Sequence, residues 1–302
     1  MNVLHTLAHL FGTTVKNRRL DIPEQFGKGY VTRFVFNEHI RMMIMNYELK
    51  ENLVIENPEI NASRSMILFK FQHIFDETEK QPSVLITTTS MNTDTVIPIH
   101  TNTSTINIEV DSNYLKSLFD LSAKSPVLEG LLQNTQPLLF EQMIYPSLQD
   151  IVNEIVSQSV AESFKMFFLR IKAEELVCRL LMELEKRDEK HLYALNSRDI
   201  ATIYKIREEM LEHLDTPPVI NDLALAANMS PTKLKSLFKQ IFGNSIFSYY
   251  QECRMKKAAL LLKEGNLSVS DVGYQLGFTN LSHFSRVFQE HIGMKPKQYS
   301  RT

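Results

Sequence analysis

Two similar patterns of apolar residues occupy the last hundred residues of the chain, at about Leu223–Gly243 and Val272–Gly293. In each, a short apolar stretch with small residues precedes a turn, and apolar residues at helical spacing follow it. The second stretches contain Leu234, Leu237, Phe238, Ile241 and Phe242 in one copy, and Phe284, Val287, Phe288 and Ile292 in the other. Phe238 and Phe288 are fifty residues apart. The pattern predicts two helix-turn-helix units.

The turn of each unit carries the signals that begin and end a helix. Ser230 is expected to cap a helix that starts at Pro231, and Gly243 is expected to end it. In the second copy, Gly277-Phe278-Thr279 makes the turn and Gly293 ends the helix. This second turn is predicted to be one residue longer.

In each predicted helix-turn-helix, the solvent-facing residues at the start and along the outer side of the second helix are basic or hydrogen-bonding, and none is acidic. They are Ser230, Thr232, Lys233, Lys235, Ser236 and Lys239 in the first copy, and Asn280, Ser282, His283, Ser285 and Arg286 in the second. Amides, hydroxyls and Arg can read base edges, while Lys and a helix N-terminus hold phosphates. Any surface helix is polar, but two such helices in tandem predict double-stranded DNA as the partner.

The segment Ser245–Lys263 between the copies also has apolar residues at helical spacing. A helix of roughly eighteen residues has a length of about 27 Å. One turn of B-DNA spans about 34 Å, so this spacing allows both second helices to enter successive major grooves. One monomer could therefore read a site that lacks twofold symmetry.

Charge separates the two ends of the chain. The chain has 33 Lys and Arg and 35 Asp and Glu. From Lys205 onward there are 13 basic and 9 acidic residues, and before Lys205 there are 20 basic and 26 acidic residues. A basic C-terminal part suits contact with phosphates. The length of 302 residues, of which 43% are hydrophobic, exceeds what a single core normally takes and predicts two domains.

The C-terminal residues resemble the AraC/XylS family of bacterial transcription regulators, over roughly Arg207–Thr302. The motifs that carry the resemblance are Asp222-Leu223-Ala224, Met229-Ser230, Leu234–Lys239, Arg254 with Ala258 and Leu261-Leu262, Val272–Phe278, Ser282–Phe288, and Gly293-Met294-Lys295-Pro296 with Tyr299. The resemblance implies that the first reading helix makes the main base contacts. Many family members have Arg where this chain has Ser236, so Lys235 or Lys239 would supply the charge here.

The first half of the chain has short apolar runs bounded by Asn, Asp, Pro and Gly. They are Tyr30–Phe36, Ile40–Glu48, Leu53–Glu56, Met66–Gln72, Val84–Thr89 and Ile106–Val110. Such runs predict antiparallel strands, here a small barrel or sandwich at about residues 21–111, and hence an α+β fold class. The segments Asp21–Glu24, Gly29-Tyr30, Tyr47–Leu49 and Ile67–Phe71 look like the pyochelin-regulator branch of the family, which implies a cupin-like barrel.

A barrel of this kind can enclose a small organic effector. The polar side chains expected to orient it are Arg33, Arg41, Tyr47 and Lys70, and apolar walls would come from Phe34, Phe36, Met42, Met43, Met45, Phe69, Phe71 and Phe75. The same apolar residues could equally fill a small core. The alternative function is a ligand-independent regulator whose first half makes protein–protein contacts, with RNA polymerase as an expected partner.

Helices are expected at about residues 113–187, with pieces at Asn113–Leu121, Val127–Asn134 and Ser147–Lys186. In the last piece, Phe164, Phe168, Ile171, Glu175, Cys178 and Met182 form one stripe, and Phe167, Leu176, Leu180, Leu181 and Leu184 widen it. Such a helix packs either on its own barrel or in a homodimer. A charged join at 188–198 separates this sensing domain, 1–187, from the DNA-binding domain, 199–302.

Several other classes of protein are disfavoured. No His-x-His pair supports a barrel metal site and no Gly-x-Ser-x-Gly elbow supports a hydrolase, so neither catalysis, a metal nor a cofactor is expected. Cys178 and Cys253 lie in helical stripes, which predicts buried, reduced thiols. No apolar run approaches twenty residues, and Met1–Phe11 lacks the features of a signal peptide, so a cytoplasmic protein without a membrane partner is expected.

Overall fold

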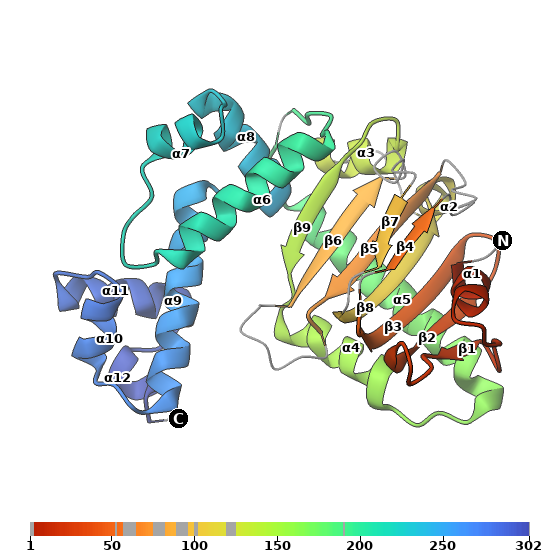
Figure 1. Cartoon of the computed structure of the whole chain (residues 1–302). Helices are drawn as coiled ribbons and strands as arrows, with labels where there is room; N and C mark the ends of the chain where they lie inside the picture. Colours follow the sequence, from red (N-terminus) through yellow and green to blue (C-terminus); the bar gives the residue numbers. More distant parts are fainter. Residues whose placement is uncertain are drawn as a thin grey trace. The chain divides into compact units, whose positions relative to one another are not determined.

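A computed structural model describes residues 3–51, 53–56, 65–74, 82–88, 96–99, 102–118, 125–189 and 191–301. The chain forms two compact units, Met1–Leu195 and Asn196–Thr302 (Figure 1). The division lies within the range 188–198 that was expected to join them. Leu195 is buried in the first unit, where its N–H donates to the carbonyl of Pro137 at 2.9 Å.

The first unit is built on an antiparallel sheet with the strand order β1-β2-β3-β8-β5-β6-β9, and a separate pair β4-β7. The strands are β1 Arg19–Asp21, β2 Gly27–Val35, β3 Ile40–Leu49, β4 Leu53–Glu56, β5 Met66–Gln72, β6 Ser83–Thr88, β7 Val96–Ile99, β8 Asn102–Asp111 and β9 Leu139–Met143. Each predicted run lies largely in one of these strands, although Thr89 falls outside the described residues. The strands β1, β7 and β9 were not predicted.

One helix before the strands and four after β8 complete the described part of the first unit. They are α1 Val3–Leu10, α2 Ser112–Leu118, α3 Pro126–Gln133, α4 Pro146–Ser157 and α5 Glu162–Glu185. The helix expected at Ser147–Lys186 is therefore two helices. The α+β fold class is confirmed.

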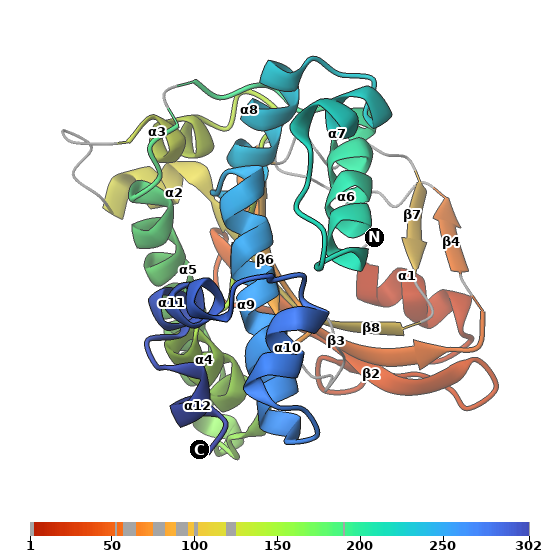
Figure 2. The same ribbon diagram turned by 90° about the vertical axis from the view of Figure 1, so that its left-hand side faces the viewer.

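The two faces of the main sheet have different neighbours. Alternate residues of the central strands, such as Phe69, Ile106 and Ile108, form one core with apolar residues of α3, α4 and α5. Figure 1 and Figure 2 agree that α1 and the pair β4-β7 lie on the other side of the sheet. Among the described residues, β1 and β9 are edge strands that do not pair with each other, so the expected barrel is an open sheet.

The long helix α5 buries most of the second expected stripe and leaves most of the first one exposed. Its buried residues are Leu169, Ala173, Leu176, Val177, Leu180, Leu181 and Leu184. By contrast, Phe164, Phe167, Ile171 and Met182 are exposed large apolar residues. Cys178 is exposed as well, so its predicted burial was wrong. The sheet accepts only one side of a helix that is apolar on more than one.

The second unit is helical. Its elements are α6 Ser197–Glu212, α7 Ile220–Ala226, α8 Pro231–Phe242, α9 Ile246–Glu264, α10 Val269–Gln275, α11 Leu281–Ile292 and α12 Pro296–Tyr299. The pairs α7-α8 and α10-α11 occupy the two predicted helix-turn-helix units. The helix predicted between them is α9, which Ser245 caps by accepting from the N–H of Ser248.

Candidate nucleic-acid interface

The second helices of the two helix-turn-helix motifs, α8 and α11, have the same length and the same kinds of ends. Both α8 and α11 have 12 residues, and Ser230 and Asn280 cap their first turns. Each ends at a glycine in the left-handed conformation, Gly243 with φ 75° and Gly293 with φ 80°. Four residues, 227–230, separate α7 from α8, and five, 276–280, separate α10 from α11. The longer second turn is as predicted.

In each helix-turn-helix motif, the first helix packs closely on the second. In the second copy, a Cβ added at Gly273 of α10 would lie 2.8 Å from Cδ2 of Leu281 and 3.2 Å from Cδ1 of Phe284. Ala224 of α7 is only 2% exposed at the corresponding place in the first copy. Small side chains at these positions let the paired helices approach closely.

The predicted contact residues of α8 lie on its outer side and differ in exposure and in ion pairing. Thr232, Lys233 and Lys235 are exposed, while Ser236 and Lys239 are half-buried. The Nζ of Lys233 lies 3.0 Å from Oδ1 of Asp199 on α6. Lys235 has no ion-pair partner among the described residues, so its ammonium is available to a ligand.

The structure gives Asn280 a role in the helix cap. Its Oδ1 accepts from the N–H groups of Ser282 and His283 at 2.9 and 3.1 Å. Ser282, His283 and Arg286 are exposed and Ser285 is half-buried. The capping residues Ser230 and Asn280 therefore orient the helix starts, and the side chains beyond them form the outward surface.

Arg254 connects α9 to the turn between α10 and α11. It is 4% exposed, and its Nε donates to the carbonyl of Leu276 at 2.8 Å. Its guanidinium lies 3.8 Å from the ring centroid of Phe278. Burial lowers the pKa of Arg254 from its ordinary value. Sequence reasoning placed Arg254 only within a family motif and did not find this role.

The loop after α6 lies directly against the same turn. Tyr250 donates its hydroxyl to the carbonyl of Leu214 at 2.8 Å. A Cβ added at Gly277, which has φ 75°, would lie 1.8 Å from the carbonyl oxygen of Asp215. Only glycine fits both this backbone conformation and this approach. These contacts join the second helix-turn-helix, α10-α11, to α9 and to the loop after α6.

The four residues predicted to orient an effector lie on one face of the main sheet. Strand pairing places Arg33 beside Met43, Met43 beside Asn107, and Asn107 beside Lys70. Arg41 and Tyr47 point to this same face because they are an even number of residues from Met43. Phe34, Met42, Phe69 and Phe71 lie on the opposite face and belong to the core that packs on the helices. Phe75 lies outside the described residues.

The charges on this face are partly compensated. Nε of Arg41 donates to Oε2 of Glu109 at 2.6 Å. Burial, and then the charge of Arg41, lower the pKa of Arg33. Burial lowers the pKa of Lys70 and raises the pKa of the Tyr47 phenol. Tyr47 also packs against α1, with Leu4, Leu7 and Phe11 in the same cluster.

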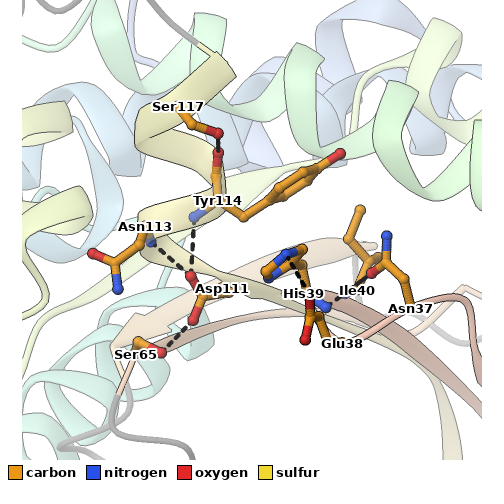
Figure 3. Close-up of polar contacts among 9 residues, drawn as sticks. All are labelled: Asn37, Glu38, His39, Ile40, Ser65, Asp111, Asn113, Tyr114 and Ser117. Atoms are coloured by element: carbon orange, nitrogen blue, oxygen red, sulfur yellow. Dashed lines mark hydrogen bonds and ion pairs between the residues drawn. The ribbon is translucent and has the colours of Figure 1, made fainter.

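A polar cluster closes the other end of the sheet, where β8 runs into α2 (Figure 3). Asp111 accepts from the N–H groups of Asn113 and Tyr114, both at 2.9 Å, and from the Ser65 hydroxyl. Burial raises the pKa of Asp111, but these hydrogen bonds outweigh it and hold the pKa below the ordinary value. The ring of His39 stacks on Tyr114 with centroids 4.9 Å apart. Asp111 therefore caps the start of α2.

The described residues hold neither a cluster of metal-ligating side chains nor a membrane-spanning helix. They contain no group of three or more His, Cys, Asp or Glu side chains arranged to hold a metal ion. In the same part of the chain, each helix is too short or too polar to cross a bilayer.

Comparison with known proteins finds a family match within the second unit and relatives whose similarity extends beyond it. Residues 223–302 match the family model described as a helix-turn-helix domain. The HTH-type transcriptional regulator GbdR of Pseudomonas aeruginosa is 31% identical over 108 residues, which cover 36% of this chain and 29% of that protein. The arabinose operon regulatory protein of Escherichia coli is 27% identical over 155 residues, 51% of each chain.

A third relative, the HTH-type transcriptional regulator MtrA of Neisseria gonorrhoeae, is 27% identical over 196 residues, 61% of this chain and 62% of that protein. The matches therefore span less than two thirds of each of these relatives. Among solved structures, the C-terminal domain of AraT, a response regulator from Geobacillus stearothermophilus, is 28% identical with a TM-score of 0.32, and the match covers 33% of this chain and 84% of that one. The relatives are named as transcription regulators, not enzymes. The resemblance to the AraC/XylS family is confirmed, and residues 223–302 form a helix-turn-helix domain of that family's type.

Proposed function

We propose that this protein is a sequence-specific DNA-binding transcription regulator of the AraC type. One observation carries the proposal: the second unit holds two capped helices, α8 and α11, each with an outward surface of basic and hydrogen-bonding side chains. Helix-turn-helix proteins place the N-terminal part of such a helix in the major groove. The tandem arrangement lets a single chain present two of them.

On α8, Thr232, Lys235 and Ser236 are the residues we propose to meet base edges, with Lys239 nearer the phosphates. On α11, Ser282, His283, Ser285 and Arg286 take the corresponding places. Hydroxyl and imidazole groups can both donate and accept, and Arg286 is the side chain here that can bind guanine through two hydrogen bonds. Nε of Arg286 lies 4.0 Å from Oε1 of Glu290, and both side chains are exposed, so this contact is weak enough to exchange for DNA.

The length of α9 supports simultaneous reading by both units. Its 19 residues correspond to about 28 Å of helix. Successive major-groove segments on one side of B-DNA lie about 34 Å apart. Arg254 holds α9 against the turn between α10 and α11, and Gly277 lies against the loop after α6, which supports a spacing that is set before DNA is bound.

We propose that a small organic effector on the first unit controls this activity by favouring one arrangement of the DNA-binding unit. An effector acts only through its different affinity for the two arrangements. The polar sheet face with Arg33, Arg41, Tyr47 and Lys70 supports this role. In the second candidate function, the first unit makes protein contacts instead, including contacts with RNA polymerase, and the exposed apolar side of α5 favours such an interface.

That side of α5 fits a second copy of the chain. Phe164, Ile171 and Cys178 follow one another at intervals of seven residues, and Phe167 lies beside them. Phe164, Phe167 and Ile171 are 65%, 67% and 44% exposed. A seven-residue apolar spacing lets two identical helices pack along their lengths. We propose a homodimer formed through α5.

Selection from random-sequence duplexes with the full chain tests the proposed function. We expect enrichment of a motif with two blocks whose centres lie about ten base pairs apart, one for each reading helix. Competition between the selected and a shuffled duplex then measures specificity at a fixed salt concentration. Enrichment of no motif, with equal affinity for both duplexes, would overturn the proposal.

A further inference from the structure

We infer that the sheet face opposite α4 and α5 binds a small hydroxylated monocarboxylate, with its carboxylate at Lys70. The inference deepens the effector part of the proposed function and rests on it, because it assigns the chemical class of that effector. It is carried by three observations on this face: an unpaired ammonium, unpartnered buried hydroxyls beside it, and a neighbouring charge that is already neutralised.

Strand register places the relevant side chains around Lys70. On β8, Asn107 is directly opposite Lys70, and Thr105 is two residues along on the same face. On β6, Leu85 is directly opposite, and Thr87 is two residues along. Directly opposite residues lie about 5 Å apart and diagonal ones about 7–8 Å apart. Thr105 is opposite Gln72 and Thr87 is opposite Leu68, so the two threonines lie on opposite sides of Lys70 along the strand. One small molecule over Lys70 therefore reaches Asn107 and one of the two threonines.

Lys70 is the unpaired charge in this arrangement. Its side chain has no hydrogen-bond or ion-pair partner among the described residues, and burial lowers its pKa. Removing an ammonium from water without an opposite charge is unfavourable. Arg41 differs, because Glu109 pairs with it. A negative group brought to Lys70 would thus meet an uncompensated positive charge in partly desolvated surroundings.

Hydroxyl and amide atoms next to Lys70 also lack partners. Thr87 and Thr105 are 8% and 6% exposed, and their Oγ1 atoms make no hydrogen bond within the described part of the chain. Oδ1 of Asn107 is buried without a partner as well. A buried polar atom that bonds to nothing costs free energy, and most such atoms in proteins are satisfied. Their concentration around one lysine points to a ligand with hydroxyl groups.

The net charge selects the class of ligand. One ammonium balances one negative charge, which suits a carboxylate better than a phosphate close to its dianion. Arg33 is in the same row, three strands from Lys70, or about 14 Å away at the spacing of neighbouring strands. That distance exceeds the size of a small acid, so Arg33 does not compete for the same carboxylate. The hydroxyls of the ligand would bond to Thr105 and Asn107.

The cavity of about 230 Å³ elsewhere in the first unit is unsuited to this ligand. Its lining includes Ile40, Val110, Leu115 and Val177, and it lies on the helix side of the sheet. Glu174 also lines it, and its negative charge would repel a carboxylate. The two sites are therefore separated by the sheet, and substitutions at Lys70 leave the cavity intact.

The test uses the full chain with lactate, gluconate and 4-hydroxybenzoate as probes, and lactamide and 4-hydroxybenzamide as neutral matches. The readouts are the thermal midpoint and the rate at which acetic anhydride modifies Lys70, followed by peptide mass spectrometry. At least one acid is expected to raise the midpoint by mass action and to slow acetylation of Lys70 several-fold. The neutral amides are expected to do neither.

Lys70→Met should abolish the rise in midpoint, while Lys28→Met should retain it. Lys28 is the matched control because it lies on the same sheet, with its side chain 80% exposed and paired with Glu48. Thr105→Val keeps the ammonium and should weaken binding several-fold. If Lys70→Met does not fold, protection of Lys70 in the unmodified chain still decides the question.

Three outcomes would overturn the inference: no probe acid affects either readout, the amides act as strongly as the acids, or Lys70→Met keeps the response. The DNA selection described above is a separate readout. Acid binding without DNA specificity would overturn the proposed regulator alone. DNA specificity without acid binding would overturn this inference alone.

Discussion

The ammonium of Lys233 on α8 lies 3.0 Å from the carboxylate of Asp199 on α6. Asp199 is held in place by the N-cap of α6, where Asn196 accepts from its N–H at 2.7 Å and donates to its Oδ2 at 3.0 Å. The side chain of Asp199 is 15% exposed and that of Lys233 is 49% exposed. An acid that pairs with a lysine of a reading helix holds that lysine back from phosphate.

Asp199→Asn should therefore strengthen binding to DNA of any sequence. Asparagine keeps a hydrogen-bonding side chain but releases the charge of Lys233, which adds about one phosphate contact. We expect the slope of log K against log salt to become steeper by about 0.9. Titrations by fluorescence anisotropy at several salt concentrations measure this slope. Asp21→Asn, in the first unit, is the control, and an unchanged slope in Asp199→Asn would remove Lys233 from the interface.

Lys235→Ala should weaken binding to the selected duplex by about 1–3 kcal/mol, and binding to a random duplex by much less. The reason is that the Lys235 ammonium is exposed, unpaired among the described residues and on the outward side of α8. Competition assays with both duplexes give the two values, with Lys28→Ala as the control. Equal losses on both duplexes would mean that Lys235 holds a phosphate instead of a base.

Gly277→Ala should destabilise the second unit far more than Gly293→Ala. Both glycines have positive φ, 75° and 80°, and alanine in that conformation costs about 1–2 kcal/mol. At Gly277 the new Cβ would also lie 1.8 Å from the Asp215 carbonyl oxygen, whereas at Gly293 it meets no atom within 4 Å. The clash adds about 1–3 kcal/mol. Urea unfolding followed by circular dichroism compares the two, and equal costs would contradict the close contact.

Substitutions on the exposed side of α5 should separate the proposed dimer. Ile171→Glu combined with Phe167→Glu places charges in the apolar stripe without touching the buried face. We expect the dissociation constant of the dimer to rise at least tenfold, as measured by sedimentation equilibrium. Lys165→Glu, also on α5, changes charge outside the stripe and should leave the mass unchanged. A monomeric unmodified chain at high concentration would rule out this dimer.

The two cysteines should react at different rates with iodoacetamide. Burial raises the pKa of Cys253 to about 11, so its thiol stays protonated near neutral pH and unreactive. Cys178 is exposed on α5. Mass spectrometry of the labelled peptides at pH 7.5 should show modification of Cys178 first. Dimer formation through α5 should slow that reaction, which offers an independent check of the interface.

Local patterns in the sequence were enough to locate both helix-turn-helix units. Capping residues, terminal glycines and apolar spacing act within a few residues of one another, so Ser230, Gly243 and Gly293 could be assigned from the chain alone. The strands with strong alternation were found for the same reason. The short strand β1 and the strand β9 were missed, because long-range pairing rather than local alternation defines them. The similarity of the first half to the pyochelin-regulator branch stays a prediction.

Tertiary contacts decided which side of each element faces what. The sequence of α5 is apolar on several sides, and only packing on the sheet shows that Leu176 is buried while Phe167 is exposed. Likewise, Phe69 and Lys70 alternate between the two faces of β5, and only the helices packed on one face decide that Phe69 is in the core. The pairing of Lys233 with Asp199 joins residues far apart in the chain. The periodicity of the sequence determines which residues share a face of a helix or strand. The elements packed around that helix or strand determine which of its faces is buried and which is exposed to a ligand.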